Sequence, residues 1–174
     1  MRTNKNRILL LLALFLFFGR MEGFAGETES EGLKPAPNIA FKDLDGNSFK
    51  LSDYRGKVVI LNFWAVWCPP CRVEIPHLVS FKEKYSDKGL VIFGIALASG
   101  DNTKIRETAL EFGINYPVVN FDDSSSIRKN FREVRMVPTS FLINKEGQIF
   151  KSYLGFASST PVEMEEDIKT LLQP

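Results

Sequence analysis

The sequence predicts an α/β fold in which a mixed β-sheet is flanked by helices on both faces, with a β-hairpin extension on its N-terminal side. Two apolar runs, at 58–65 and 90–97, have the composition of strands buried on both faces. Segments with helix-start signals follow both runs. Near the C-terminus, two further strand-like runs joined by a short turn precede a last helix, which indicates antiparallel pairing there.

The first half of the domain begins with a hairpin over residues 41–51, because Asp45-Gly46-Asn47 is turn chemistry between two alternating stretches. The strand at 58–65 leads directly into a helix over about 70–85. The strand at 90–97 is followed by Asp101-Asn102-Thr103, which can cap a helix reaching to about residue 112.

The second half contains a short strand at 117–119 and a short helix at 124–131. Strands at 137–143 and 148–154 flank a four-residue turn, so they are expected to pair antiparallel. The last helix has Thr160 as its predicted N-cap, Pro161 at its first position and Glu163 three residues after the cap. This combination predicts a capping box.

The N-terminus has the pattern of an export signal. Basic residues precede an uninterrupted apolar run at 8–18, and small residues follow at Gly23 and Ala25. The run is shorter than the roughly 20 residues that a membrane-spanning helix needs. A cleaved signal is therefore the first interpretation, and a retained membrane anchor is the second.

The chain of 174 residues accordingly divides into three parts. Residues 1–25 are expected to be the signal or anchor, 26–34 a flexible leader, and 35–174 the folded domain. Export would place the protein in the periplasm or at the outer face of the cytoplasmic membrane, where disulfides persist. The formal charge of +1 gives no basic footprint for nucleic acid.

Cys68 and Cys71 are the only two cysteines, and they stand at the junction between a strand and a helix. A disulfide across so short a loop stabilises little, which favours a redox role over a static one. At the helix start, free N–H groups and the helix dipole favour a thiolate, so Cys68 is the expected nucleophile, with an accessible sulfur. Cys71 would be the resolving thiol, facing the core. Pro69 and Pro70 lack N–H groups that could otherwise favour the thiolate.

Glu74 lies three residues after Cys71 on the same predicted helix. If it is buried, its raised pKa suits it to take the Cys71 proton; the alternative is an ordinary solvated glutamate. A metal site is the other competitor. The two cysteines and His77 supply at most three ligands, whereas structural zinc takes four. We therefore expect no metal and no cofactor beyond the cysteine pair, and His77 to lie on the helix surface.

The segment Asn62 to Cys71 resembles the active site of the thioredoxin superfamily. More narrowly, the chain resembles the TlpA/ResA group of extracytoplasmic thiol-disulfide oxidoreductases, over residues 35–173. Further matches support this resemblance, in the following segments: Pro35 to Ile39, Leu51 to Lys57, Cys71 to Pro76, and Val137 to Thr139.

The resemblance implies roles for particular residues. The Val137–Pro138 bond would be cis and would lie beside the disulfide, where it offers backbone groups to a substrate, and Trp67 would flank the sulfurs. Glu74 would be the acid–base residue. Asn62 stands where thioredoxins carry a buried aspartate, so Glu74 would have to replace that proton relay.

The resemblance also implies a function: reduction of disulfides in client proteins by a monomer, recharged by a membrane thiol-transfer partner. Apocytochrome c is one client that it suggests, because the group often serves cytochrome c maturation. Three alternatives stay open. They are a disulfide-forming oxidase, a thiol peroxidase (although the threonine-containing peroxidatic motif is absent around Cys68) and a redox-inert metal-binding module. No role is assigned to residues 122–135.

Overall fold

The computed structural model of the chain describes residues 32–173. The expected signal or anchor at 1–25, and the leader up to residue 31, lie outside the described residues. Among the helices that are described, none has both the length and the apolar composition to cross a membrane.

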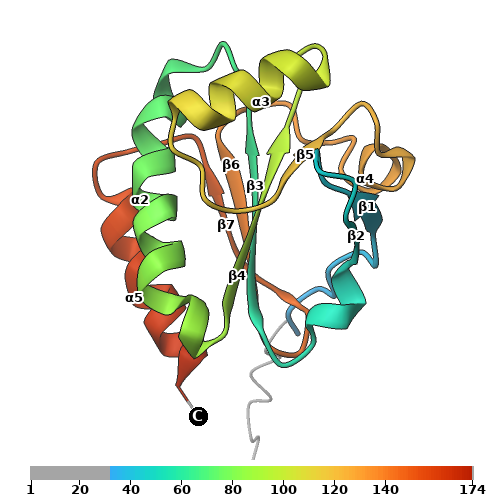
Figure 1. Cartoon of the computed structure of the whole chain (residues 1–174). Coiled ribbons are helices and arrows are strands. Elements are labelled where there is room, and N and C mark those ends of the chain that lie inside the picture. Colours follow the sequence, from blue (N-terminus) through green and yellow to red (C-terminus); the bar gives the residue numbers. More distant parts are fainter. Residues whose placement is uncertain (1–31, 174) are drawn as a thin grey trace, which may run out of the picture. The chain divides into compact units, whose positions relative to one another are not determined.

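A five-stranded sheet forms the centre of the domain, in the order β5-β4-β3-β6-β7 (Figure 1). Strand β3 (Val58–Trp64) is parallel to β4 (Leu90–Ala96), which is parallel to β5 (Val118–Asn120). On its other side β3 pairs antiparallel with β6 (Thr139–Ile143), and β6 pairs antiparallel with β7 (Ile149–Leu154). The prediction of a mixed sheet is therefore confirmed. All seven residues of β3 are buried, as its apolar composition predicts.

The predicted hairpin is also present. Strands β1 (Ala40–Lys42) and β2 (Ser48–Lys50) form a separate antiparallel pair. The Asp43 carboxylate closes the turn, since its Oδ1 accepts the backbone N–H groups of Asp45 at 3.0 Å and Asn47 at 2.8 Å. This use of aspartate is the reason the residue type is frequent in turns. A short 3₁₀ helix, η1 (Leu51–Tyr54), follows.

Helices cover both faces of the sheet, as Figure 1 shows. The side with α2 (Pro69–Tyr85) and α5 (Thr160–Leu172) is opposite the side with the hairpin and α4 (Ser125–Asn130). Helix α3 (Asn102–Glu111) packs at the end of the sheet where β3 and β4 terminate, and a 3₁₀ turn, η2 (Ser86–Lys88), joins α2 to β4.

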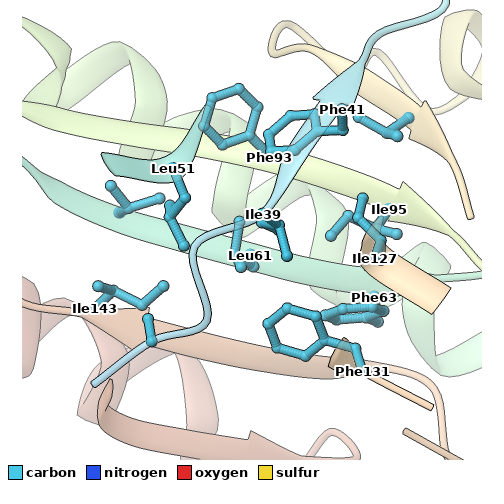
Figure 2. Close-up of a cluster of buried hydrophobic side chains, with 13 residues drawn as sticks. Ile39, Phe41, Leu51, Leu61, Phe63, Phe93, Ile95, Ile127, Phe131 and Ile143 are labelled. Atoms are coloured by element: carbon cyan, nitrogen blue, oxygen red, sulfur yellow. The ribbon is translucent and has the colours of Figure 1, made fainter. Parts of the chain in front are cut away.

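Alternate residues of β3 enter two different cores. On the hairpin side, the side chains drawn in Figure 2 form an aromatic and aliphatic cluster around Phe63 and Phe93. The Phe41 ring packs edge-on against Phe93, with centroids 5.0 Å apart. On the α2 side, Val58 and Ile60 meet apolar residues of both long helices, which are Leu78, Phe81, Tyr85, Met164 and Ile168. The period of two along a strand explains this division.

The start of α5 differs from the prediction. Ser159, and not Thr160, is the N-cap residue; it makes no side-chain capping bond, so the predicted capping box is wrong. The reason is local: the Thr160 hydroxyl accepts the N–H of Ala157 at 3.1 Å, which commits it to the preceding turn. The Glu163 N–H bonds the carbonyl oxygen of Ser159 at 3.1 Å, so Pro161 occupies the second helical position.

Candidate active site

A disulfide joins Cys68 and Cys71 across the first turn of α2. Cys68 is the N-cap residue, with extended backbone, and the two prolines occupy the first helical positions, where a missing N–H is tolerated. The first available donor is therefore the N–H of Cys71, which points at the Cys68 sulfur at 3.2 Å. One helix-start donor is thus directed at Cys68 despite Pro69 and Pro70.

Both sulfurs are buried in this disulfide form. Cys68 is 4% exposed and Cys71 is fully buried. The expectation of an accessible Cys68 is therefore wrong for the oxidised state, because its sulfur is bonded to a residue whose side chain lies in the core. The two cysteines lie in a buried apolar cluster that includes Trp64 and Ile75. The partly buried side chain of Val137 packs against this cluster.

Glu74 lies within the protein, one turn after Cys71, and only 2% of it is exposed. Its Oε2 accepts the side-chain amide of Asn62 at 2.7 Å, and its Oε1 accepts the hydroxyl of Ser140 at 3.4 Å. Burial raises the pKa of Glu74 from 4.5 to about 7, and these two hydrogen bonds oppose the rise. The interpretation as a solvated surface glutamate is therefore wrong. At neutral pH the carboxyl can both take up and release a proton.

Ser140 is a residue of this site that the sequence does not indicate, and Asn62 stands out in the sequence only as a departure from the thioredoxin pattern. The two residues are paired neighbours on β6 and β3, and their side chains are hydrogen-bonded at 2.9 Å. An amide inside an otherwise apolar strand was a signal for Asn62. Ser140 could be connected with Glu74 only once the pairing register was known.

The segment before Cys68 is fixed by the loop after β4. The indole N–H of Trp67 donates to the carbonyl oxygen of Ala98 at 2.8 Å, although 61% of Trp67 is exposed. The N–H of Val66 donates to the hydroxyl of Ser99 at 3.2 Å, and this hydroxyl donates to the Leu97 carbonyl at 3.0 Å. Nothing in the sequence indicated that this loop supports the site.

The Val137–Pro138 peptide bond is cis, as the resemblance implied. Pro138 is buried, and its carbonyl oxygen accepts the N–H of Gly155 at 2.8 Å. Val137 packs against the cluster that contains the two cysteines. The fold thus brings Val137 to the cluster that contains the two cysteines, and Glu74 follows Cys71 by one turn on α2.

His77 is exposed on α2, as predicted, and its ring stacks on Phe156 with centroids 6.1 Å apart. Across residues 32–173, no group of three or more histidine, cysteine, aspartate or glutamate side chains is arranged to hold a metal ion.

The sheet order and a disulfide at the start of the helix after β3 define a thioredoxin-like protein that exchanges thiols and disulfides. Residues 33–152 match the AhpC/TSA family, and the chain belongs to that family.

Two relatives are thiol-disulfide oxidoreductases named ResA. The protein from Bacillus cereus is 32% identical over 175 residues, which cover 97% of this chain and 98% of the relative. The protein from Bacillus subtilis is 34% identical over 152 residues, covering 87% and 81%.

Solved structures show the same fold. A thiol:disulfide interchange protein of the thioredoxin family from Chlorobium tepidum is 29% identical, with a TM-score of 0.71 over 81% of this chain and 97% of the other. A thiol:disulfide interchange protein from Bacteroides sp. is 27% identical, with a TM-score of 0.66 over 79% and 90%. The chain is therefore a thiol-disulfide oxidoreductase, and protein thiols and disulfides are the substrates that its family implies.

Proposed function

We propose that the protein acts outside the cytoplasm as a reductant of client disulfides, with Cys68 as nucleophile, Cys71 as resolving thiol and Glu74 as acid–base group. One observation carries the acid–base part of this proposal: a carboxyl with a pKa raised to about 7 lies buried one helical turn after Cys71. A base that serves proton transfer near neutral pH needs such a pKa.

The first step begins from the reduced protein. The Cys68 thiolate attacks one sulfur of the client disulfide, which breaks the client S–S bond and forms a mixed disulfide through Cys68. The other client sulfur leaves as a thiolate and takes a proton from water. The helix start and the Cys71 N–H directed at Cys68 favour the thiolate that this attack requires.

The second step resolves the mixed disulfide. The Cys71 thiol gives its proton to the Glu74 carboxylate, and the resulting thiolate attacks the Cys68 sulfur. The Cys68–Cys71 disulfide forms, and the second client sulfur leaves as a thiolate. The client gains two electrons and the cysteine pair loses two, so this exchange requires no external cofactor.

Client binding is assigned to Trp67, Val137 and Pro138. Trp67 offers an exposed indole face beside the cysteines. The backbone N–H and carbonyl groups of Val137 make no hydrogen bond to another residue in the described range, so they are available to an extended client segment. Such pairing would place a client cysteine beside the disulfide.

The sequence and its resemblance to the TlpA/ResA group support the proposed compartment and partners. The signal-like pattern at 1–25 supports export, to the periplasm or the outer face of the cytoplasmic membrane. A reductant in an oxidising compartment must be recharged, which supports a membrane thiol-transfer donor. We propose apocytochrome c as one client, by resemblance to the TlpA/ResA group, and a monomeric state.

The direction of electron flow is tested by the reduction potential of the Cys68–Cys71 pair, measured against defined thiol buffers. A value near or below about −270 mV supports the reductant, whereas a value near −120 mV would establish the disulfide-forming oxidase instead. Consumption of hydrogen peroxide without a protein substrate would point to the thiol peroxidase.

A further inference from the structure

The α2-facing layer of β3 contains one polar residue between apolar neighbours. Asn62 is completely buried, and so are Ile60 and Trp64, which share its face of the strand. Its paired neighbour on β6, Ser140, is also completely buried. Burying an amide and a hydroxyl is unfavourable unless both are hydrogen-bonded, so their placement needs an explanation beyond packing.

The hydrogen bonds of these two residues converge on Glu74. The Asn62 amide nitrogen donates one proton to Glu74 Oε2 at 2.7 Å and the other to the Ser140 oxygen at 2.9 Å. The Ser140 hydroxyl then donates to Glu74 Oε1 at 3.4 Å. In this arrangement Glu74 only accepts, which suits the ionised carboxylate.

The carbonyl oxygen of Asn62 accepts no hydrogen bond from any residue in the described part of the chain. If the amide turned over while Glu74 was ionised, this oxygen would face the carboxylate, which is repulsive. Once Glu74 is protonated this repulsion is lost, but the reversed amide would direct both of its N–H groups to the place where the Asn62 oxygen now finds no partner. The orientation in which Asn62 donates to Glu74 is therefore the one that suits the ionised carboxylate, and a leucine at this position would offer no donor.

We propose that Asn62 and Ser140 are positioning residues for Glu74: their side-chain donors hold its carboxylate in one place and favour the ionised form over the carboxylic acid. The inference rests on the proposed acid–base role of Glu74 and adds the groups that set its proton affinity.

Few other titratable groups act on this carboxyl. Cys68 and Cys71, at the start of the same helix, do not titrate as a disulfide. Tyr116, from the segment before β5, has its pKa raised by burial and, to a lesser extent, by the charge of Glu74, so it stays neutral near pH 7. Removal of the donors from Asn62 or Ser140 is therefore expected to act directly on Glu74.

The direct test is the titration of the Glu74 side chain in the oxidised protein, followed by NMR of carbon-13-labelled glutamate and assigned with Glu74→Gln. One hydrogen bond to a charged group changes an equilibrium constant by roughly 10- to 100-fold. We expect Asn62→Leu to make Glu74 a weaker acid by about tenfold or more.

Two pairs of variants keep the test decisive. Ser140→Ala should also weaken the acid, while Ser140→Thr, which keeps the hydroxyl, should stay close to the unmodified protein. If Asn62→Leu fails to fold, this serine pair decides. The matched control is Asn120→Leu: Asn120 is 5% exposed on β5 and bonds Gly100 and Asn102 instead of Glu74. Its loss should leave the Glu74 titration unchanged. An unchanged Glu74 titration in folded Asn62→Leu and Ser140→Ala would overturn the proposal.

A kinetic measurement separates positioning from a purely structural role. Resolution of a mixed disulfide on Cys68 requires ionised Glu74, so the pH at which its decay rate is half-maximal should rise in Asn62→Leu. This rise should equal the upward shift of the Glu74 titration midpoint. In a Glu74→Gln background, Asn62→Leu should not move the midpoint further; an additional shift would contradict action through Glu74. If the titration responds but no thiol exchange occurs, the proposed function fails while the positioning stands. If exchange occurs and the titration does not respond, the positioning fails alone.

Discussion

Replacing Glu74 with glutamine should change how the stability of the oxidised protein depends on pH. Glutamine keeps the shape of the side chain and can still accept from Asn62, but it never ionises. In the native protein the carboxyl is 2% exposed and its pKa is raised from 4.5 to about 7, with burial as the main cause. The folded state therefore binds this proton more tightly than the unfolded state does.

The direction and size of the effect follow from that difference. Below pH 4.5 the carboxyl is protonated in both states, and its contribution to the free energy of unfolding is fully present. Between pH 4.5 and about 7 only the unfolded state releases the proton, so stability falls as pH rises, by about 1.4 kcal/mol per pH unit. The loss is complete above pH 7 and amounts to about 3 kcal/mol. Glu74→Gln is free of this loss.

Urea denaturation at pH 4 and pH 8, with the disulfide intact, measures the effect. We expect the difference in unfolding free energy between Glu74→Gln and the unmodified protein to shift by about 3 kcal/mol in favour of the variant from pH 4 to pH 8. Other carboxylates titrate equally in both proteins and cancel. Glu166→Gln, at an exposed glutamate of α5, is the control and should show no such shift. A difference for Glu74→Gln that is the same at both pH values would refute the burial argument.

Three further outcomes are expected. Phe93→Ala removes a ring that packs against Phe41, Phe49 and Tyr54, and should lower the free energy of unfolding by about 3–5 kcal/mol in urea; a loss below 1 kcal/mol would contradict this packing. Gly94→Ala places a Cβ 3.1 Å from both the indole nitrogen of Trp64 and the Tyr116 ring. The free energy of unfolding, measured by thermal denaturation, should fall by about 1–3 kcal/mol; an unchanged value would mean that the two side chains move aside without cost. Trp67 is exposed and makes one side-chain hydrogen bond, so Trp67→Ala should change the free energy of unfolding by less than about 1 kcal/mol. The same variant should slow the reduction of a protein disulfide more than the reduction of a small aromatic disulfide. Equal slowing of both reactions would contradict a role of Trp67 in client binding.

The features that the sequence indicated correctly are mostly local. The continuous apolar run of β3 and the turn chemistry at Asp45 each lie within a few residues of chain, and each forms as expected. The pairing of Cys68 with Cys71, and the place of Glu74 one turn further on, depend only on helical spacing. The start of α5 was wrong by one residue because a hydroxyl can serve a turn as well as a cap.

The features that the sequence did not indicate depend on long-range contacts. Asn62 and Ser140 are 78 positions apart, and Val66 and Ser99 are 33 apart, so each pairing requires the register of the sheet or the path of a loop. The burial of Cys68 was missed for a similar reason. Its place at a helix start suggested access to solvent, whereas the disulfide draws its sulfur toward the core residue Cys71.

The assignment of the two cysteine roles is tested most directly by trapping the mixed disulfide. Each single-cysteine variant is incubated with a disulfide-bonded protein such as insulin, and adducts are located by mass spectrometry. We expect Cys71→Ser to accumulate an adduct on Cys68, and Cys68→Ser to accumulate little, since Cys71 is fully buried. An adduct on Cys71 that forms readily in Cys68→Ser, with none in Cys71→Ser, would contradict the assignment.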